Sequence, residues 1–195
     1  MRRAVLNLFA AVLITTAAWG QGSEWQIDPA HTTVGFTVRH LGISNVHGRF
    51  TKVSCSATVD DRDLTKSTVN ATMDVASINT GNDGRDNDLR SPNYFDAAQF
   101  PNMTFKSKSI TKNGDNKLKL VGDLTIKGVT KEVTLDVDGP SAPMKMGPNQ
   151  RRGLSATTSV NRKDFGVGAK APAAMISEEI KIDLDVELTQ KAAGQ

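Results

Sequence analysis

Apolar and polar residues alternate with a period of two along most of the chain. The clearest example is EIKIDLDVEL, residues 179–188, in which every second residue is aliphatic and each of the others is charged. Alternation of this kind predicts β-strands with one face in a core and one in water. The same pattern recurs in seven more segments, at 33–39, 53–59, 68–75, 103–110, 118–126, 133–137 and 154–160. The chain is therefore predicted to be all-β, with about eight antiparallel strands.

Short polar segments join several of these strands. KNGDNK (112–117) and IKGVTKE (126–132) have the composition of tight turns. Eight antiparallel strands can close into a barrel, which removes the sheet edges and can hold one small ligand. They can also form a two-sheet sandwich with a filled core. The alternation leaves both architectures open, although Gly122, within an apolar row, leaves interior room and favours a cavity.

Residues 79–105 interrupt the alternation and predict one or two short helices, at 84–91 and 93–98. A long excursion from a barrel is commonly a lid or a wall of the pocket. The acidic stretch DGRDNDLR within it does not match a calcium loop, because Ser91 and Ala97 would occupy the sixth and twelfth positions counted from Asp86. We interpret this stretch as a solvated helix.

The first twenty residues have a different character from the rest. Arg2 and Arg3 precede an apolar run from Ala4 to Ile14, which small residues follow. This arrangement predicts a secretory signal peptide over residues 1–20. An N-terminal membrane anchor is the alternative, but the run is shorter than the ~20 residues that a span requires. We expect residues 21–195 to form a single domain in the periplasm or outside the cell, without a stable membrane span.

Charge and cysteine content narrow the classes of function. The chain has 24 basic and 21 acidic residues. Two of the basic residues lie in the predicted signal peptide, so the remainder carries a net charge of about +1. This balance gives no electrostatic basis for binding nucleic acid. Cys55 is the only cysteine, so no internal disulfide can form, and its place in an alternating segment predicts a buried, unreactive thiol.

All three histidines lie within DPAHTTVGFTVRHLGISNVHGRF, residues 28–50. At ~3.3 Å per residue, one strand would separate His31 from His40 by roughly 30 Å, so they cannot share a metal. A hairpin would bring His40 and His47 together, but two histidines are half of a zinc site. The chain also lacks the motifs of catalytic serines and of phosphate-binding loops. We therefore predict no metal, no cofactor and no catalytic residue.

Four motifs, spread through the chain, give a more specific indication. They are WQIDPAHTTVGFTVRHLGISNVHGRF (25–50), FPNMTFKS (100–107), GDLTIKGVTKEV (122–133) and NRKDFG (161–166). Together and in this order they resemble the YceI-like family of secreted bacterial proteins, also called polyisoprenoid-binding. The resemblance implies a lipocalin-like eight-stranded barrel with an apolar tunnel. It also implies a carrier of isoprenoid lipids or related long-chain amphiphiles, such as polyprenyl phosphates, quinones, fatty acids or fatty amides.

The resemblance, taken with the apolar strand faces, also implies site residues. The tunnel wall would contain Val34, Phe36, Val38, Phe50, Met73, Leu89, Tyr94, Phe95, Phe105, Leu124 and Phe165. The headgroup would be held by His31, His40, Arg85 and Arg162. An ion pair between Arg162 and Asp164 that organises a loop is an equal alternative for that arginine.

Tail binding of this kind needs no special chemistry, because each buried CH₂ contributes ~0.8 kcal/mol. The expected partner is one lipid ligand, and the sequence is compatible with a homodimer. Two other functions stay open. One is an enzyme acting on a lipid inside the barrel, with His31 or His40 as a base. The other is a stress-related interaction protein with a filled core.

Overall fold

The computed structural model describes residues 22–191, so the predicted signal peptide lies outside the described residues. The described part contains twelve strands: β1 (Ser23–Ile27), β2 (Thr33–His40), β3 (Ser44–Phe50), β4 (Val53–Val59), β5 (Thr68–Asp74), β6 (Ile78–Asn79), β7 (Asn102–Lys112), β8 (Lys117–Ile126), β9 (Val129–Asp138), β10 (Met144–Met146), β11 (Asn149–Asn161) and β12 (Ile176–Lys191). It also contains the helix α1 (Asp83–Arg90) and three short 3₁₀ helices, η1 (Leu64–Lys66), η2 (Val75–Ser77) and η3 (Arg162–Phe165).

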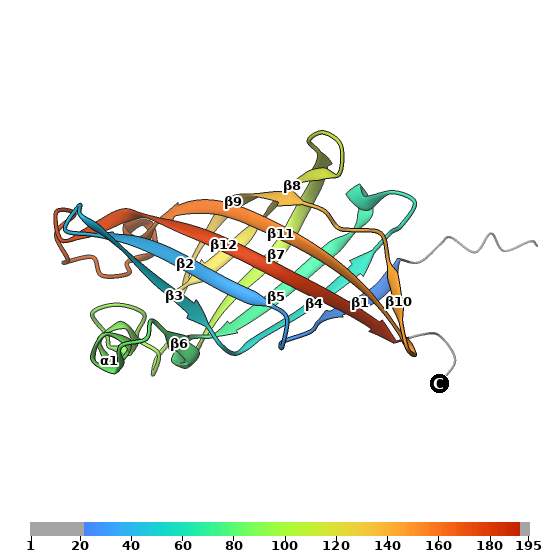
Figure 1. Ribbon diagram of the computed structural model, residues 1–195. Helices are drawn as coiled ribbons and strands as arrows, with labels where there is room; N and C mark the ends of the chain where they lie inside the picture. Colours follow the sequence, from blue (N-terminus) through green and yellow to red (C-terminus); the bar gives the residue numbers. More distant parts are fainter. Residues whose placement is uncertain (1–21, 192–195) are drawn as a thin grey trace, which may run out of the picture.

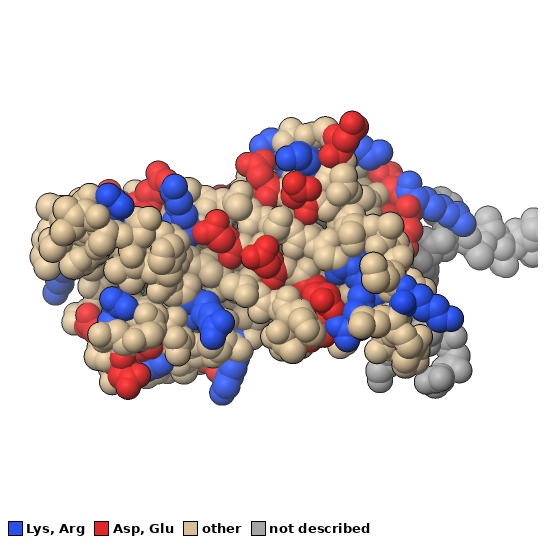
Figure 2. Space-filling view, viewed as in Figure 1, with Lys and Arg blue, Asp and Glu red and all other residues tan. Residues whose placement is uncertain are grey.

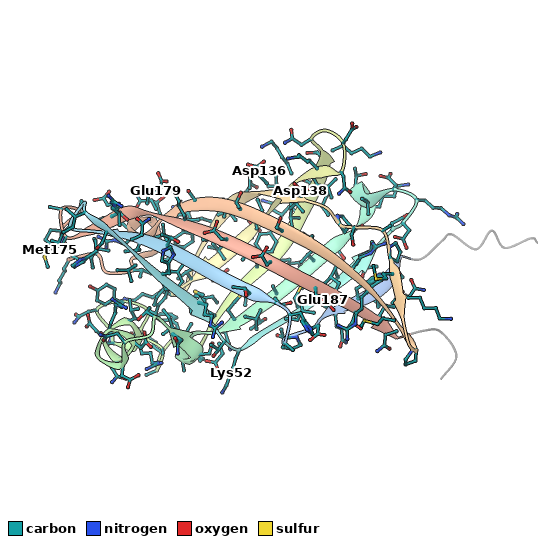
Figure 3. The ribbon with its side chains drawn as sticks, viewed as in Figure 1. Lys52, Asp136, Asp138, Met175, Glu179 and Glu187 are labelled. Carbon is teal, nitrogen blue, oxygen red and sulfur yellow. The ribbon has the colours of Figure 1, made fainter. Side chains whose placement is uncertain are left out.

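Eight of these strands close into an antiparallel barrel (Figure 1). The order around the ring is β11-β9-β8-β7-β5-β4-β1-β12, and β12 pairs back onto β11. The predicted barrel is therefore confirmed over the sandwich. The charged residues alternating along the strands lie on the outside, as Figure 3 shows for Asp136 and Asp138 on β9 and Glu179 and Glu187 on β12.

Strand β12 joins the ring to a separate hairpin. One edge of β12 pairs with β11 along most of its length. The other edge pairs first with β2, over Ile176–Asp185, and then with β1, at Leu188 and Thr189. The β2–β3 hairpin therefore lies outside the ring and extends the barrel wall at one end, on the left in Figure 1.

The sequence pattern predicted eight of the twelve described strands and missed four. Seven of the eight predicted segments belong to the ring, and 33–39 forms β2, outside it. The missed strands are β1, β3, β6 and β10. Three of them, β1, β6 and β10, have five residues or fewer, and β3 carries few aliphatic residues on its inner face. In β3 the inner row contains Gly48 between Val46 and Phe50, which weakens the alternation. The predicted tight turns are confirmed, and Lys127 and Gly128 turn the chain with positive φ angles of 50° and 76°.

The excursion at 79–105 contains one helix in the described chain. The Asn82 side chain accepts a hydrogen bond from the backbone N–H of Arg85 and caps α1. The second predicted helix, at 93–98, is wrong. Those residues form turns that fold back on the end of α1, with Ala97 N–H donating to Arg90 O, and Asp96 has a φ of 53° that no right-handed helix accommodates.

Helix α1 is solvated only in part, which corrects a second expectation. Asp86 is 3% exposed, and its carboxylate accepts hydrogen bonds from the backbone N–H and the hydroxyl of Thr80. These bonds fasten the helix to the segment that follows β6. The acidic residue at the centre of the helix therefore holds α1 against the barrel.

Candidate functional site

The barrel encloses a cavity of about 690 Å³, a volume within the range of small-molecule sites. Its wall consists mainly of aliphatic and aromatic side chains from the inward faces of the strands. Among the described residues the charged groups of the wall are few: Arg85 and Asp88 on α1 and Arg162 on η3. The interior is thus an apolar chamber, and the charged side chains of its wall come from α1 and η3.

The charged groups gather at one end of the cavity. Gly168, in the loop after η3, donates its N–H to Asn93 O, so this loop and the segment after α1 are in contact. Arg162 donates to the carbonyl of Ile176, which pairs in turn with His40 at the end of β2. Helix α1, the loop and the hairpin end therefore lie around the same end of the cavity, which we call the mouth; Figure 1 shows these three elements at one end of the barrel.

All eleven residues predicted for the tunnel wall line this cavity. They are Val34, Phe36, Val38, Phe50, Met73, Leu89, Tyr94, Phe95, Phe105, Leu124 and Phe165. Their contact with a ligand stays a prediction. For the residues on strands this placement follows from strand parity, because alternate residues of a strand point to the same face. Leu89, Tyr94, Phe95 and Phe165 lie on α1, in the turns after it and on η3, where parity does not apply.

Aromatic rings narrow the chamber near the mouth. The ring centroids of Phe36 and Phe50 lie 5.9 Å apart, and those of Phe50 and Phe95 lie 6.0 Å apart in an edge-to-face arrangement. The Phe36 ring covers Gly48, where a Cβ would lie 2.2 Å from a ring carbon. Only glycine therefore fits opposite Phe36 in this arrangement.

Gly122 has a different role from the one expected. A Cβ at this position would lie 2.4 Å from the Phe105 ring and 2.6 Å from the carbonyl oxygen of Lys106. The room left by this glycine is thus filled by the Phe105 ring and by backbone. The interior space exists, but Gly122 contributes to it only by allowing Phe105 to pack flat against the wall.

Arg162 anchors the loop at the mouth. Its side chain is 5% exposed, and its guanidinium donates to five carbonyls, those of Val167, Gly168, Ala171, Ile176 and Ser177. These bonds engage all of its nitrogen atoms. The loop-organising alternative is correct, but the partners are carbonyls and not Asp164, which is exposed.

Arg85, Asp88, Tyr94 and His40 are polar groups at the mouth that remain accessible, and of these Arg85 and Tyr94 offer permanent donors. Arg85 is exposed, and it donates from Nε to the Thr80 hydroxyl (2.7 Å) and from a terminal nitrogen to the Thr80 carbonyl (3.0 Å). Burial, assisted by the charge of Asp88, raises the pKa of the Tyr94 hydroxyl. Tyr94 is therefore a neutral hydrogen-bond donor at physiological pH.

The histidines do not form a common site. His40 lines the cavity at the mouth and pairs with Ser44, whereas His47 pairs with Thr37 and its ring bonds the Thr37 hydroxyl (3.0 Å). The predicted meeting of His40 and His47 across the hairpin is wrong, because the two side chains point to opposite faces of the sheet.

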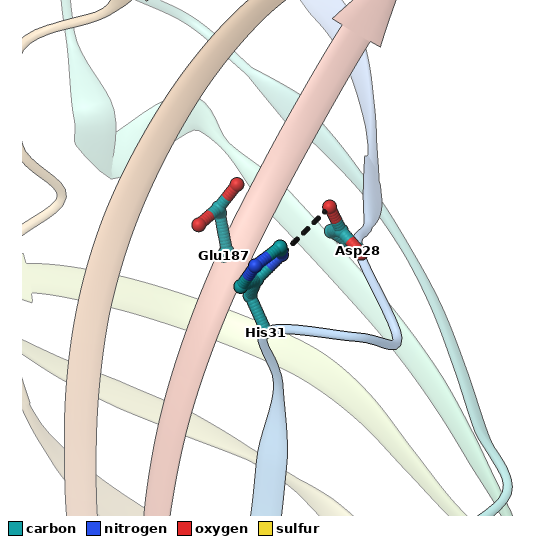
Figure 4. A group of neighbouring side chains, drawn as sticks. All are labelled: Asp28, His31 and Glu187. Carbon is teal, nitrogen blue, oxygen red and sulfur yellow. Dashed lines mark hydrogen bonds and ion pairs between the residues drawn. The ribbon is translucent and has the colours of Figure 1, made fainter.

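His31 lies outside the cavity wall, near the opposite end of β12. Its Nδ1 is 3.1 Å from an oxygen of Asp28, and Glu187 completes the group shown in Figure 4. The guanidinium of Arg151 bonds both carboxylates, at 2.7 Å from Asp28. Hydrogen bonds from His31 and then Arg151 lower the pKa of Asp28 to about 2. A cation would have to displace Arg151, so this group is best described as an ion-pair network.

Cys55 faces the cavity from β4 and is partly buried. Burial raises the pKa of its thiol to about 11. This agrees with the expected unreactive thiol.

The sequence analysis missed a buried arginine at the far end of the barrel. Arg152 is 4% exposed, lies 4.6 Å over the ring of Trp25, and donates to Asp61 at 2.7 Å. The signal was available, because Arg152 has the same inward parity on its strand as Leu154 and Ala156.

No helix of residues 22–191 combines the length and the apolar content that crossing a bilayer requires.

Comparison with known proteins identifies relatives that match almost the whole chain. Protein YceI of Escherichia coli is 32% identical over 193 residues, which is 98% of this chain and 100% of that protein. A crystal structure of the YceI protein of Campylobacter jejuni is 34% identical, covers 85% of this chain and 96% of its own, and has a TM-score of 0.72.

A more distant structure shares the fold. It is a polyisoprenoid binding domain from Saccharophagus degradans, 17% identical, with a TM-score of 0.65, covering 86% of this chain and 98% of its own. The family described as the YceI-like domain matches residues 25–188. Since this match extends over almost the whole described barrel, the chain belongs to the YceI-like domain family.

Proposed function

We propose that this protein is a carrier that binds one isoprenoid or related long-chain amphiphile, such as a polyprenyl phosphate, a quinone, or a fatty acid or amide. The observation that carries the proposal is the cavity of about 690 Å³, whose wall is mainly apolar and whose charged side chains lie at one end. This polarity matches an amphiphile whose tail lies inside the barrel and whose headgroup lies at the mouth. The carrier would work in the periplasm or outside the cell.

The energetics favour tail binding. Each CH₂ removed from water contributes ~0.8 kcal/mol, so a long tail supplies ample affinity from the apolar wall alone. At the mouth, Arg85 and Tyr94 offer N–H and O–H donors to a phosphate, carbonyl or amide oxygen. His40, which also lines the mouth, is a further candidate for the headgroup.

Binding explains the interior better than the two alternatives do. A filled core, which a pure interaction protein would have, is at odds with the open chamber. A lipid-modifying enzyme would need a base held beside the reacting atoms, such as His31 or His40. His31 lies outside the wall, and His40 lies at the rim, where a headgroup would pass.

The test is native mass spectrometry of the purified protein, followed by extraction of any released lipid. We expect a lipid mass on the wild type and on Thr104→Asp, which places a charge on the exposed outer face of β7. We expect none on Phe105→Asp, which places the same charge inside the cavity one residue further along. Circular dichroism checks that both variants fold.

If Phe105→Asp fails to fold, Ala71→Leu replaces it. Ala71 faces Phe105 across the β5–β7 pair and lines the cavity, so the extra bulk occludes the tail without adding charge. Equal lipid loading of the outer and inner variants would contradict the proposal. So would a wild type that stays empty after incubation with polyprenyl phosphate, quinone and fatty acid.

A further inference from the structure

Three large apolar side chains are exposed to water at the mouth end of the barrel. Leu41 is 49% exposed, Ile43 76% and Met175 50%. Figure 3 shows Met175 at the extreme left end of the molecule. Leu41 and Ile43 belong to the β2–β3 turn, and Met175 to the loop before β12, and the Leu41 N–H donates to Met175 O at 2.9 Å. The turn and the loop that carry the three side chains are therefore bonded to each other, and we call the three side chains the mouth patch.

The mouth patch is continuous with the cavity wall. His40 and Ile176, the residues next to Leu41 and Met175, both line the cavity and pair with each other. An apolar path therefore runs from the chamber over the rim to the outside. A ligand tail leaving the mouth would pass along this path.

The backbone of the turn gives no structural reason for leucine. Leu41 has a φ of 51° and Gly42 a φ of 69°, and Ile43 N–H closes the turn on His40 O. The left-handed region favours glycine or asparagine. Leu41 thus occupies a position unfavourable for its backbone and leaves half of its side chain in water. A contact outside the fold would account for a leucine at this position.

The charge around the mouth patch indicates the kind of surface it meets. Residues 39–47 include Arg39 and no acidic residue, and residues 166–176 include Lys170 and no acidic residue. Figure 2 shows mostly uncharged surface over this end, with basic and acidic residues at its margin. Apolar side chains flanked by Lys and Arg fit the interface of an anionic bilayer. The apolar side chains would insert between the lipid tails, and the cations would bind the anionic headgroups.

The shape of the mouth agrees with this orientation. The acidic residues Asp83 and Asp88 lie on α1, across the mouth from the patch. Figure 1 shows the β2–β3 turn and the loop before β12 extending beyond α1 at this end. The patch would therefore reach a bilayer before the acidic helix does.

We propose that the mouth patch docks on the surface of an anionic lipid bilayer, with the cavity mouth facing the membrane. The purpose of this docking rests on the proposed carrier function, since an amphiphile could then pass between barrel and bilayer without exposing its tail to water. Three side chains and two nearby cations give a reversible, salt-sensitive contact.

The test is co-sedimentation with vesicles of phosphatidylcholine and phosphatidylglycerol. The double variant Ile43→Asp/Met175→Asp removes the patch. The matched control is Met144→Asp/Met146→Asp, which changes two exposed methionines on β10 at the opposite end. All proteins carry the same N-terminus, verified by mass. We expect the patch variant to lose vesicle binding by about tenfold or more and the control to bind like the wild type.

Three results would overturn docking: a wild type that does not bind these vesicles, a patch variant that binds unchanged, or a control that loses as much as the patch variant. Light scattering supplies a further check. A wild-type dimer that becomes monomeric only in the patch variant would identify the patch as an interface between two copies of the chain.

Lipid loading from detergent, measured by native mass spectrometry, separates the docking proposal from the carrier proposal. A wild type that loads lipid but ignores vesicles refutes docking alone, and one that binds vesicles but never loads lipid refutes carriage.

Discussion

Cys55 offers a direct measure of whether the cavity is occupied. It is the only cysteine of the chain, so an alkylating reagent reports on this one position. Its thiol lines the cavity from β4, opposite Ala71 on β5. We expect alkylation to be slow in the empty barrel and slower again once a lipid tail fills the chamber.

The slow reaction of the empty barrel follows from the thiol's pKa. Burial raises this pKa from 9.0 to about 11, and the thiolate is the form that reacts. A shift of two units lowers the thiolate fraction at pH 8 by roughly a hundredfold. Iodoacetamide labelling, followed over time by intact mass, measures the rate. The control is Cys55→Ser/Ser56→Cys, which moves the thiol to the exposed outer face of the same strand.

The expected result is a Cys55 rate about a hundredth of the control rate, with a further decrease on adding lipid that only the wild type shows. A Cys55 thiol that reacts as fast as the control would refute its enclosure. A rate that is slow but indifferent to lipid would leave the enclosure intact and contradict tail binding.

Three other predictions concern the stability of the barrel. Gly122→Val should displace the Phe105 ring and destabilise the fold by ~1–3 kcal/mol, seen as a Tm several degrees lower. An unchanged Tm would show that the Phe105 ring and the neighbouring backbone can move without cost. Arg162→Met leaves five carbonyls without their donor and should lower the free energy of unfolding by on the order of 3 kcal/mol, with faster amide exchange in the loop at 166–176. Arg162→Lys, which has only three donors, should recover little of this stability. Asp28 has a pKa lowered from 3.8 to about 2, so its contribution to stability is present above pH 4 and is lost as the pH falls toward 2. Thermal melts of Asp28→Asn should therefore show a smaller decrease of Tm between pH 4 and pH 2 than the wild type does. An equal decrease in the two proteins would contradict the lowered pKa.

Strand parity made the wall of the site predictable. A residue such as Phe105 or Leu124 on the apolar face of a closed sheet can only point inward, so its place in the wall follows from the sequence. Alternation alone did not predict that the sheet closes into a barrel, because a sandwich shows the same alternation. The prediction of a closed barrel came from the family resemblance, which the comparisons confirm.

Parity identifies the face of the sheet but not the position along the barrel axis. His31 and His40 were assigned to one headgroup site, yet they lie at opposite ends of β2, one outside the wall and one at the mouth. Arg162 was expected to bind a headgroup or a carboxylate. Its five carbonyl partners depend on the path of a loop, and no periodic pattern specifies that path. The turns at 93–98 were missed for the same reason.

The β2–β3 hairpin lies outside the ring that closes the barrel, yet it forms part of the mouth. The ring is closed by β11, β12 and β1 whether or not the hairpin keeps its length or sequence. A designer could therefore exchange residues 41–43 while leaving the closed barrel unchanged. The fold thus separates a ring whose closure must be kept from a hairpin whose turn can be varied.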